Sequence, residues 1–450
     1  MNNFLFDEFE GVSEKAWKQK IQVDLKGLDY NETLLWHTNE GITVKPFYSK
    51  EDQTHQHLQL PENDFFICET VFVDDVNIAN KLAVDALNRG ANAIEFVVDK
   101  TFDIDVLLVN IDINSNIRFY FKFNFLDADF VEKLSKATNS SNCYFNIDII
   151  GNLAKTGNWF TNLKSDHEQL EKITTQNNSI AVNASIYQNA GANCTQQLAY
   201  ALAHANEYLN HFEGNIADKI HFNFSVGSNY FFEIAKLRAF RILWNALLKE
   251  YGIENKEDAH IFTQPSLRNK TLYDYNVNML RTTSESMSAV LGGTNTVSNV
   301  SYDEIFHKSN EFGERISRNQ LLVLKEESGF ENAQHFADGS YYIESITQQL
   351  AENALEIFKQ IEQGGGFLKQ LKEGIIQRKI EESAQKEQEL FDNGNLVLLG
   401  TNKIQNDKDQ MKNDLELFPF VKKRLEKTLI QPIIQKRLAE KLEQQRLEDE

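Results

Sequence analysis

The sequence is poor in cysteine and proline and has no long apolar run, and these shortages exclude several classes of protein. Three cysteines (Cys68, Cys143 and Cys194) occur in 450 residues, and no pair has C-x-x-C spacing, so neither a disulfide framework nor a zinc site is indicated. This usage fits a reducing compartment, and we expect a cytoplasmic protein. No segment approaches the roughly 18 consecutive apolar residues of a membrane-spanning helix. The acidic start "MNNFLFDEFEGVSEKAW" does not resemble a signal peptide.

Basic residues are also scarce, because 46 Lys and Arg face 66 Asp and Glu and leave a net charge of −20. Nucleic acids and anionic membranes need clustered basic residues, so neither is expected as a partner. The sequence contains no G-x-G-x-x-G, no G-x-x-x-x-G-K and no G-x-S-x-G, which gives no support for a dinucleotide fold, a P-loop or a serine hydrolase. The triple glycine 364–366 lacks a following Lys-Ser/Thr and is interpreted as a turn between helices.

What the chain does contain is a regular alternation of short apolar strands and longer amphipathic helices. Eight such repeats predict parallel strands, and eight is the number that closes a (β/α)8 TIM barrel; an open doubly wound sheet is the alternative. Two helices, 195–212 and 230–251, should lie on the outer ring with their apolar faces on the strands. The predicted strands are 93–98, 117–123, 143–150, 179–187, 220–227 and 259–266, with weaker ones near Thr294–Val300 and Ala333–Ser340.

This alternation divides the chain into an N-terminal extension (1–92), the barrel (93–363) and a C-terminal helical region with a charged tail (364–450). The extension is rich in aromatic residues, including Phe4, Phe6, Phe9 and Trp17, so it is expected to pack on its own barrel or on a partner subunit. The tail from Gln405 is expected to be helical, with short apolar stripes that need a surface.

Four segments carry a resemblance to a known family. They read "NMLRTTSESMSAVLGGTNTVS", "GERISRNQLLVLKEESG", "ADGSYYIESIT" and "NGNLVLLGTNKI", all between Thr271 and Ile404. In order and spacing they resemble the cobalamin-dependent methylmalonyl-CoA mutases. In that family a cobalamin domain follows the barrel and carries D-x-H-x-x-G, whose histidine ligates cobalt. Here the last histidine is His335, so no such motif follows.

The resemblance therefore implies a small, non-catalytic subunit that forms a heterodimer with a large subunit. Adenosylcobalamin would be bound by that partner, and this chain would bind no cofactor or metal. The complex would interconvert methylmalonyl-CoA and succinyl-CoA. Two alternatives stay open: an active mutase half that receives cobalamin from a separate subunit, and a free-standing acyl-CoA-binding regulatory barrel.

Two family positions bear on activity. Active subunits carry I-R-Q-Y-A-G-F before the first barrel strand, and the matching segment here is 67–73, which places Cys68 at the arginine, Thr70 at the tyrosine and Phe72 at the glycine. Active subunits also carry a histidine shortly before a helix that reads F-F-E-E-I-A-K, and this position is Gly227 here. Because glycine has no side-chain donor, the resemblance predicts that both catalytic positions have been lost.

The interior of the barrel is expected to be filled. Barrels without a ligand path are packed with layers of large side chains, so we predict no continuous channel and no micromolar CoA binding. The stretch 258–263 reads D-x-H-x-x-T, which is one residue from the cobalt-ligand motif, but it lies on a predicted strand and is interpreted as a chance match. Candidates to fill the interior are Phe96, Phe119, Phe121, Phe123, Tyr144, Phe145, Phe222, Phe224 and Phe262.

Overall fold

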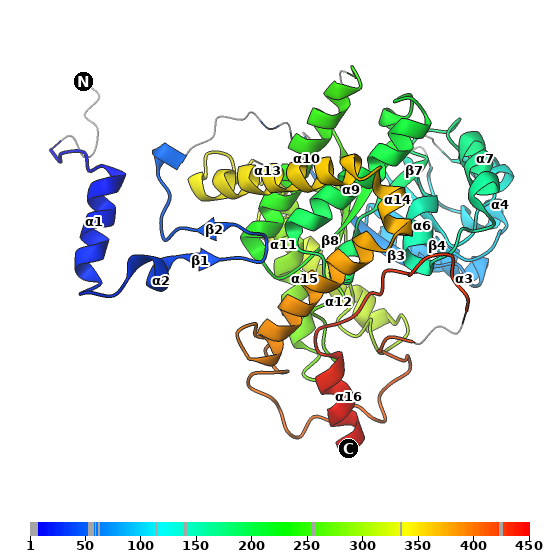
Figure 1. Ribbon diagram of the computed structural model, residues 1–450. Helices are drawn as coiled ribbons and strands as arrows, with labels where there is room; N and C mark the ends of the chain where they lie inside the picture. Colours follow the sequence, from blue (N-terminus) through cyan, green and yellow to red (C-terminus); the bar gives the residue numbers. More distant parts are fainter. Residues whose placement is uncertain are drawn as a thin grey trace.

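Eight parallel strands form one sheet at the centre of the molecule (Figure 1). The structure is a computed structural model that describes residues 8–52, 58, 60–61, 64–113, 115–138, 142–253, 258–333, 335–422 and 426–450. The strands are β3 (Phe66–Phe72), β4 (Ala93–Val98), β5 (Arg118–Phe123), β6 (Cys143–Asn146), β7 (Ile180–Asn183), β8 (Ile220–Val226), β9 (His260–Pro265) and β10 (Thr296–Ser298).

The sheet curls into a nearly closed barrel. Its order is β6-β5-β4-β3-β10-β9-β8-β7, so β6 and β7 are the two ends. These ends meet, because the Phe145 amide donates to the Asn178 carbonyl at 2.9 Å and the Ala181 amide donates to the Ile147 carbonyl at 3.0 Å. The predicted barrel is therefore confirmed, and the alternative of an open sheet is wrong.

Helices surround the barrel because one face of each strand is apolar. The predicted outer helices at 195–212 and 230–251 are observed as α9 (Cys194–His211) and α10 (Tyr230–Glu250). Phe222 on β8 lies 4.5 Å from Phe240 and 4.9 Å from Trp244 on α10, measured between ring centroids. The other helices around the barrel are α3 (Val76–Asn88), α4 (Ile104–Leu107), α5 (Ala128–Ala137), α6 (Ile149–Thr156), α7 (Leu163–Ile173), α8 (Ser185–Asn189), α11 (Val277–Leu291) and α12 (Glu311–Leu322).

An aspartate begins the helix after each of the first four strands of the barrel. Asp75, Asp103, Asp127 and Asp148 each accept a hydrogen bond from the first turn of α3, α4, α5 and α6, respectively. Such N-caps satisfy amide groups that have no partner within the helix. They also fix where each strand ends at its carboxyl side, and we call this end of the barrel its mouth.

Two of the strand predictions need correction. The predicted eighth strand near Ala333–Ser340 is wrong, because Gly339 adopts φ +79° in a turn and Ser340 caps the helix α13 (Tyr341–Gln363). The missing strand is β3, which pairs with both β4 and β10 and lies in the segment assigned to the extension. Glu69 in its middle obscures the apolar pattern; its carboxylate is buried and accepts a hydrogen bond from Arg318 at 2.9 Å.

The N-terminal arm extends away from the barrel (Figure 1). It contains α1 (Glu14–Asp24), α2 (Tyr30–Leu34) and a two-stranded ribbon of β1 (Trp36–His37) and β2 (Thr43–Val44). No residue of α1 is buried; Trp17 stacks on Phe47 at 4.6 Å and stays 51% exposed, while Phe9 is 68% exposed. Phe4 and Phe6 lie outside the described residues. The arm thus leaves apolar surface uncovered.

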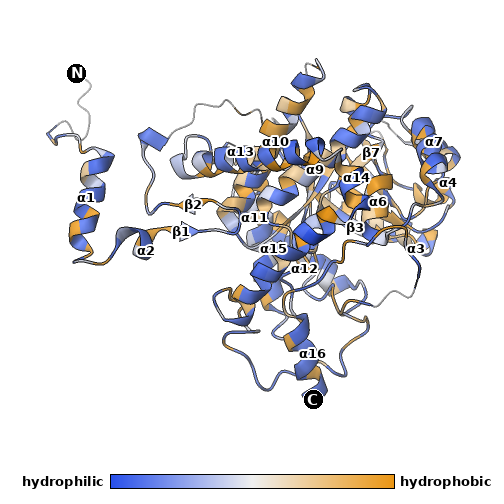
Figure 2. Ribbon diagram, viewed as in Figure 1, coloured by the Kyte–Doolittle hydropathy of each residue, from blue (hydrophilic) through white to orange (hydrophobic). Residues whose placement is uncertain are grey.

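Helix α13 ends at Gln363, and the C-terminal region (364–450) contains α14 (Phe367–Lys372), α15 (Ile375–Asp392) and α16 (Glu440–Asp449). The prediction of a helical tail from Gln405 is wrong for most of its length, since only α16 is helical in the described part of the tail. Pro419 and Pro432 lack an amide donor and interrupt any longer helix. Figure 2 shows α16 as mainly hydrophilic, and no helix within the described ranges is long and apolar enough to cross a membrane.

Residues 427–438, which we call the strap, cross the mouth without forming a helix or strand. The amides of Leu429 and Ile433 donate to the carbonyls of Gly157 and Ala154 after β6, at 3.0 and 2.8 Å. Further along, the Lys436 amide bonds to Asn189 after β7, and the Leu438 amide bonds to Arg268 after β9. The strap therefore joins three loops of the mouth.

Candidate functional site

Aromatic rings occupy the middle of the barrel. Tyr120 stacks on Tyr144 with ring centroids 4.9 Å apart, and Tyr144 stacks on His260 at 4.0 Å. Phe262 lies 4.8 Å from Tyr120, and Phe66 belongs to the same buried cluster. Large side chains thus fill the interior at this level, as in barrels whose axis is packed.

Two of the nine residues predicted to fill the interior, Tyr144 and Phe262, do so, whereas Tyr120 and Phe66 were missed. Side chains alternate along a strand, so the phenylalanines at 119, 121 and 123 share one face, and that face packs on the helices. The remaining seven predicted residues belong to this outer core: Phe96, Phe119, Phe121, Phe123, Phe145, Phe222 and Phe224.

Polar groups inside the barrel hydrogen-bond to one another. The Tyr120 hydroxyl contacts His260 Nε2 at 2.8 Å and Thr296 Oγ1 at 2.7 Å. Burial raises the pKa of Tyr120 well above its usual value and lowers that of His260 well below. Both groups are therefore held neutral, which suits a dry interior.

A second chain of hydrogen bonds runs from β8 to β4. His221 Nε2 lies 2.6 Å from Asn146 Oδ1, and the Asn146 amide donates to Glu95 Oε1 at 3.2 Å. Burial lowers the pKa of His221 to about 3. This histidine is neutral at physiological pH and acts as a fixed donor inside the barrel.

Thr70 takes part in this interior network. Its hydroxyl donates to Glu95 Oε2 at 3.2 Å and lies 2.9 Å from Ser298 Oγ. Cys68, two residues earlier on β3, is buried in the aromatic cluster, and Phe72 ends the strand 52% exposed. The side chain at position 70 therefore links β3, β4 and β10.

Gly227 lies at the mouth, at the carboxyl end of β8. Its amide donates to Glu233 Oε1 at 2.9 Å, and the Glu233 carboxylate pairs with the buried Lys236. A Cβ atom at position 227 would lie 3.1 Å from Gln188 Nε2 and 3.3 Å from Glu233 Oε1. Both atoms are ends of flexible side chains that would have to shift by a few tenths of an ångström to admit a Cβ atom, and a small cavity of about 110 Å³ borders Gly227.

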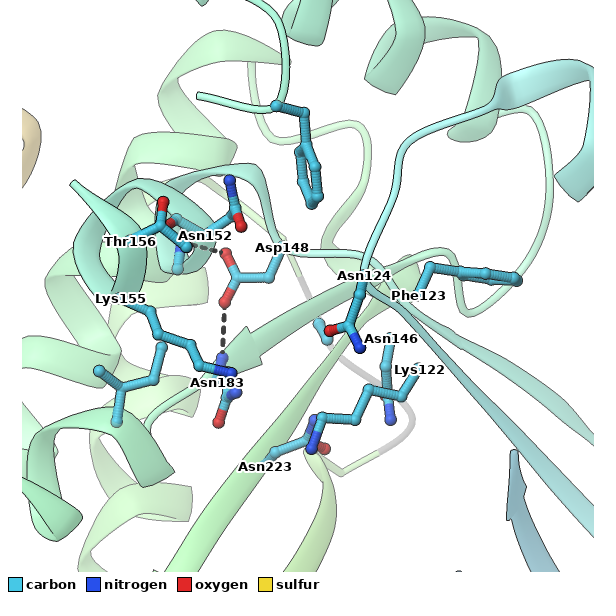
Figure 3. A pocket seen from close by; sticks show the side chains of 14 residues that line it. Lys122, Phe123, Asn124, Asn146, Asp148, Asn152, Lys155, Thr156, Asn183 and Asn223 are labelled. Atoms are coloured by element: carbon cyan, nitrogen blue, oxygen red, sulfur yellow. Dashed lines mark hydrogen bonds between the residues drawn. The ribbon is translucent and has the colours of Figure 1, made fainter. Parts of the chain in front are cut away.

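A cavity of about 340 Å³ opens at the mouth between β5, β6, β7 and β8 (Figure 3). Lys122 reaches it from β5 and Lys155 from α6, so two ammonium groups line one space. The carboxamides Asn146, Asn183 and Asn223 come from three strands. The remaining lining residues are Phe123, Asn124, Asp148, Gly151, Asn152, Thr156, Phe160, Ala181 and Ile186. Such a cavity suits a polar or anionic ligand.

Asp148 fixes the wall of this cavity. Its Oδ1 accepts hydrogen bonds from His204 Nε2 at 2.9 Å, Tyr208 Oη at 2.8 Å and the Gly151 amide at 2.7 Å. Burial by itself would raise the pKa of Asp148, but His204 and the backbone donors outweigh it and hold the pKa below its usual value. The sequence did not predict this role of Asp148, because its only signal is an aspartate between a strand and a helix.

The histidine of the D-x-H-x-x-T stretch does not fit a cobalt ligand. His260 lies inside the barrel on β9, and its Nε2 is engaged by Tyr120. Asp258 of the same stretch forms an ion pair with the buried Arg241. In the part of the chain that the structure describes, no group of three or more His, Cys, Asp or Glu residues is arranged to hold a metal ion.

The fold and the cavity define a (β/α)8 barrel with a polar chamber at the carboxyl ends of its strands. A family model described as methylmalonyl-CoA mutase matches residues 103–448. The chain is 33% identical over 440 residues to a methylmalonyl-CoA mutase small subunit from Porphyromonas gingivalis, covering 89% of this chain and 71% of that one. The chain belongs to the methylmalonyl-CoA mutase family, whose members use adenosylcobalamin.

Other relatives are longer than this chain. The human mitochondrial methylmalonyl-CoA mutase is 28% identical over 470 residues, covering 87% of this chain and 61% of that one. The Escherichia coli methylmalonyl-CoA mutase is 34% identical over 248 residues, covering 53% of this chain and 35% of that one. Among solved structures, the Yersinia pestis dihydropteroate synthase overlays with a TM-score of 0.34 at 12% identity, over 61% of this chain and all of that one. The barrel assignment rests on the strand order and on the hydrogen bonds that join the two ends of the sheet.

Proposed function

We propose that this chain is the non-catalytic small subunit of a heterodimeric methylmalonyl-CoA mutase in the cytoplasm. Its partner is a large subunit that binds adenosylcobalamin and interconverts methylmalonyl-CoA and succinyl-CoA. The small subunit stabilises that partner. The likeness to the Porphyromonas gingivalis small subunit supports this assignment.

The observation that carries the proposal is the state of the two family catalytic positions. At position 70, where active subunits carry a tyrosine, the threonine hydroxyl is hydrogen-bonded to Glu95 and Ser298. At position 227 the glycine amide donates to Glu233, and glycine offers no side-chain donor where active subunits carry a histidine. Both positions serve the packing of the barrel, so chemistry is assigned to the partner.

The exposed arm supports the expected heterodimer. Trp17 is 51% and Leu28 64% exposed, and apolar surface on an otherwise charged chain is typical of a subunit contact. We place the partner contact on the N-terminal arm ahead of β3, because β3 and α3, which the predicted extension (1–92) included, belong to the barrel.

Co-expression with the large subunit tests the proposal. The two chains should elute together on gel filtration, and mutase activity should require the large subunit. Thr70→Ala in the small subunit should leave the activity of the complex unchanged, because the threonine only contacts its own barrel. Loss of activity in an intact Thr70→Ala complex would contradict the assignment. So would adenosylcobalamin retained by the isolated chain at near one per chain after desalting.

One observation favours a second candidate, an acyl-CoA-binding regulatory barrel. The cavity at the mouth carries Lys122 and Lys155, which suit an anionic ligand. Calorimetry with CoA separates the two functions. The small-subunit proposal expects no saturable binding at micromolar CoA, whereas binding that is lost in Lys122→Met supports the second candidate.

A further inference from the structure

Two histidines that are far apart in the sequence meet on the outer surface of the barrel. His167 lies on α7 and His211 is the last residue of α9. Their ring centroids are 4.8 Å apart, with an angle of 59° between the ring planes. The two imidazole rings are therefore neighbours across α7 and α9.

Each ring already has one nitrogen held by an acceptor. His167 Nδ1 lies 2.7 Å from the Leu163 carbonyl, and because a carbonyl only accepts, Nδ1 carries the proton and Nε2 keeps its lone pair. His211 Nε2 lies 3.1 Å from Glu171 Oε1, which leaves Nδ1 with the lone pair in the neutral ring. Histidines that bind metals are oriented by such carbonyl and carboxylate partners.

We propose that His167 and His211 form a two-imidazole chelate for a divalent transition-metal ion such as Zn²⁺, Ni²⁺ or Cu²⁺. Neutral imidazole suits these ions. His211 is 35% exposed, so water completes the coordination, and the net charge of −20 attracts cations. The bound ion ties α7 to α9. The site uses no residue of the mouth and does not depend on the proposed function.

Trp159 provides a direct signal for binding. Its ring lies 5.7 Å from that of His167 in an edge-on arrangement, so Cu²⁺ on His167 should quench its fluorescence. The experiment titrates metal-free full-length chain with Cu²⁺ and with Zn²⁺, followed by fluorescence for Cu²⁺ and by calorimetry for both. We expect one ion per chain. Trp159→Phe should remove most of the quenching and keep the heat of binding.

Variants identify the ligands. His167→Gln and His211→Gln should each weaken binding about tenfold or more, because the second imidazole of a chelate binds at high effective concentration. Acidification should release the ion, since metal binding requires neutral imidazole. His335→Gln, which changes an exposed histidine elsewhere, is the matched control and should bind as the wild type does.

Two results overturn the proposal. One is the absence of saturable binding by the wild-type chain. The other is binding of one ion per chain that persists unchanged in the double variant H167Q/H211Q, which would place the ion elsewhere. Circular dichroism of each variant in the absence of metal establishes that a loss of binding does not reflect unfolding.

Discussion

Acidification should weaken the fold through the neutral histidines inside the barrel, and His221 allows the effect to be calculated. Burial lowers its pKa to about 3, whereas a histidine in the unfolded chain titrates near 6.5. The unfolded chain therefore binds this proton more readily than the folded one. Stability falls as the pH decreases through the window from about 6.5 to about 3.

The size of the effect follows from the same two values. Between pH 7 and pH 5 the unfolded histidine becomes almost fully protonated, which costs about 2 kcal/mol of unfolding free energy. Over the whole window the cost approaches about 5 kcal/mol. His221→Gln keeps a donor for Asn146 but does not titrate, so its stability should lack this component.

Urea denaturation at pH 7 and pH 5 measures the effect. The unfolding free energy of the wild type should decrease by about 2 kcal/mol more than that of His221→Gln. Comparison of the pH dependence cancels any constant cost of the substitution, and it also cancels most of the contribution of the neighbouring His260. His37→Gln in the N-terminal arm should retain the wild-type pH dependence. Parallel pH dependence of wild type and His221→Gln would refute the reasoning.

Three further predictions follow from packing and charge. Leu237→Asp should lower the unfolding free energy by about 3–5 kcal/mol in urea, because it buries an unpaired charge, whereas Leu237→Met should cost less than about 1.5 kcal/mol. Gly157→Ala should free the strap for limited proteolysis, since its Cβ would lie 2.7 Å from the Ile430 carbonyl oxygen; Gly252→Ala, with similar φ and open space, should not. Burial lowers the pKa of His307, but Asp303 and Asp414 raise it more, so the pKa in the folded chain is above its usual value. The two ion pairs therefore stabilise the fold at pH 6, and this stabilisation is lost as the pH rises through the folded pKa. The stability difference between wild type and His307→Gln should therefore shrink on going from pH 6 to pH 9.

The barrel could be predicted because apolar strands and helices alternate along the chain. α10 is 21 residues long, and its predicted range, 230–251, is within one residue of the observed one. Strand β3 could not be recognised in the same way. Glu69 faces the helices and finds its partner in Arg318, 249 residues away, and no local pattern reveals such a pair.

The inner face of the strands was harder to predict than the strands themselves. On β5, Phe119, Phe121 and Phe123 share one face, while Arg118, Tyr120 and Lys122 share the other. The sequence shows these two faces but not which of them points to the axis. The helices provide the larger apolar surface, so the three phenylalanines pack outward against them. The face with Arg118, Tyr120 and Lys122 points to the barrel axis.

The positions at Thr70 and Gly227 could be found from the family motifs, but their surroundings could not. Glu95, which accepts from Thr70, comes from the neighbouring strand, and the Glu233 carboxylate accepts from the backbone amide of Gly227. Contacts of this kind depend on the three-dimensional arrangement of the strands. For the same reason Asp148, the centre of the cavity wall, carried no sequence signal beyond its place as a helix cap.

The strap is synthesised long after the loops that it joins. The side-chain amide of Asn158, after β6, donates to the carbonyl of Lys427, 269 residues later. The loop after β6 therefore lacks this contact until Lys427 has been synthesised. At ribosomal rates of about 5–20 residues per second this interval lasts roughly 15–55 s. The barrel strands are all made before the strap emerges. After β10 ends at Ser298, 129 further residues lead to Lys427, which takes roughly 6–26 s at the same rates. During this shorter time all the barrel strands exist but the mouth is incomplete, so it is open to a chaperone or an early partner until the strap is added.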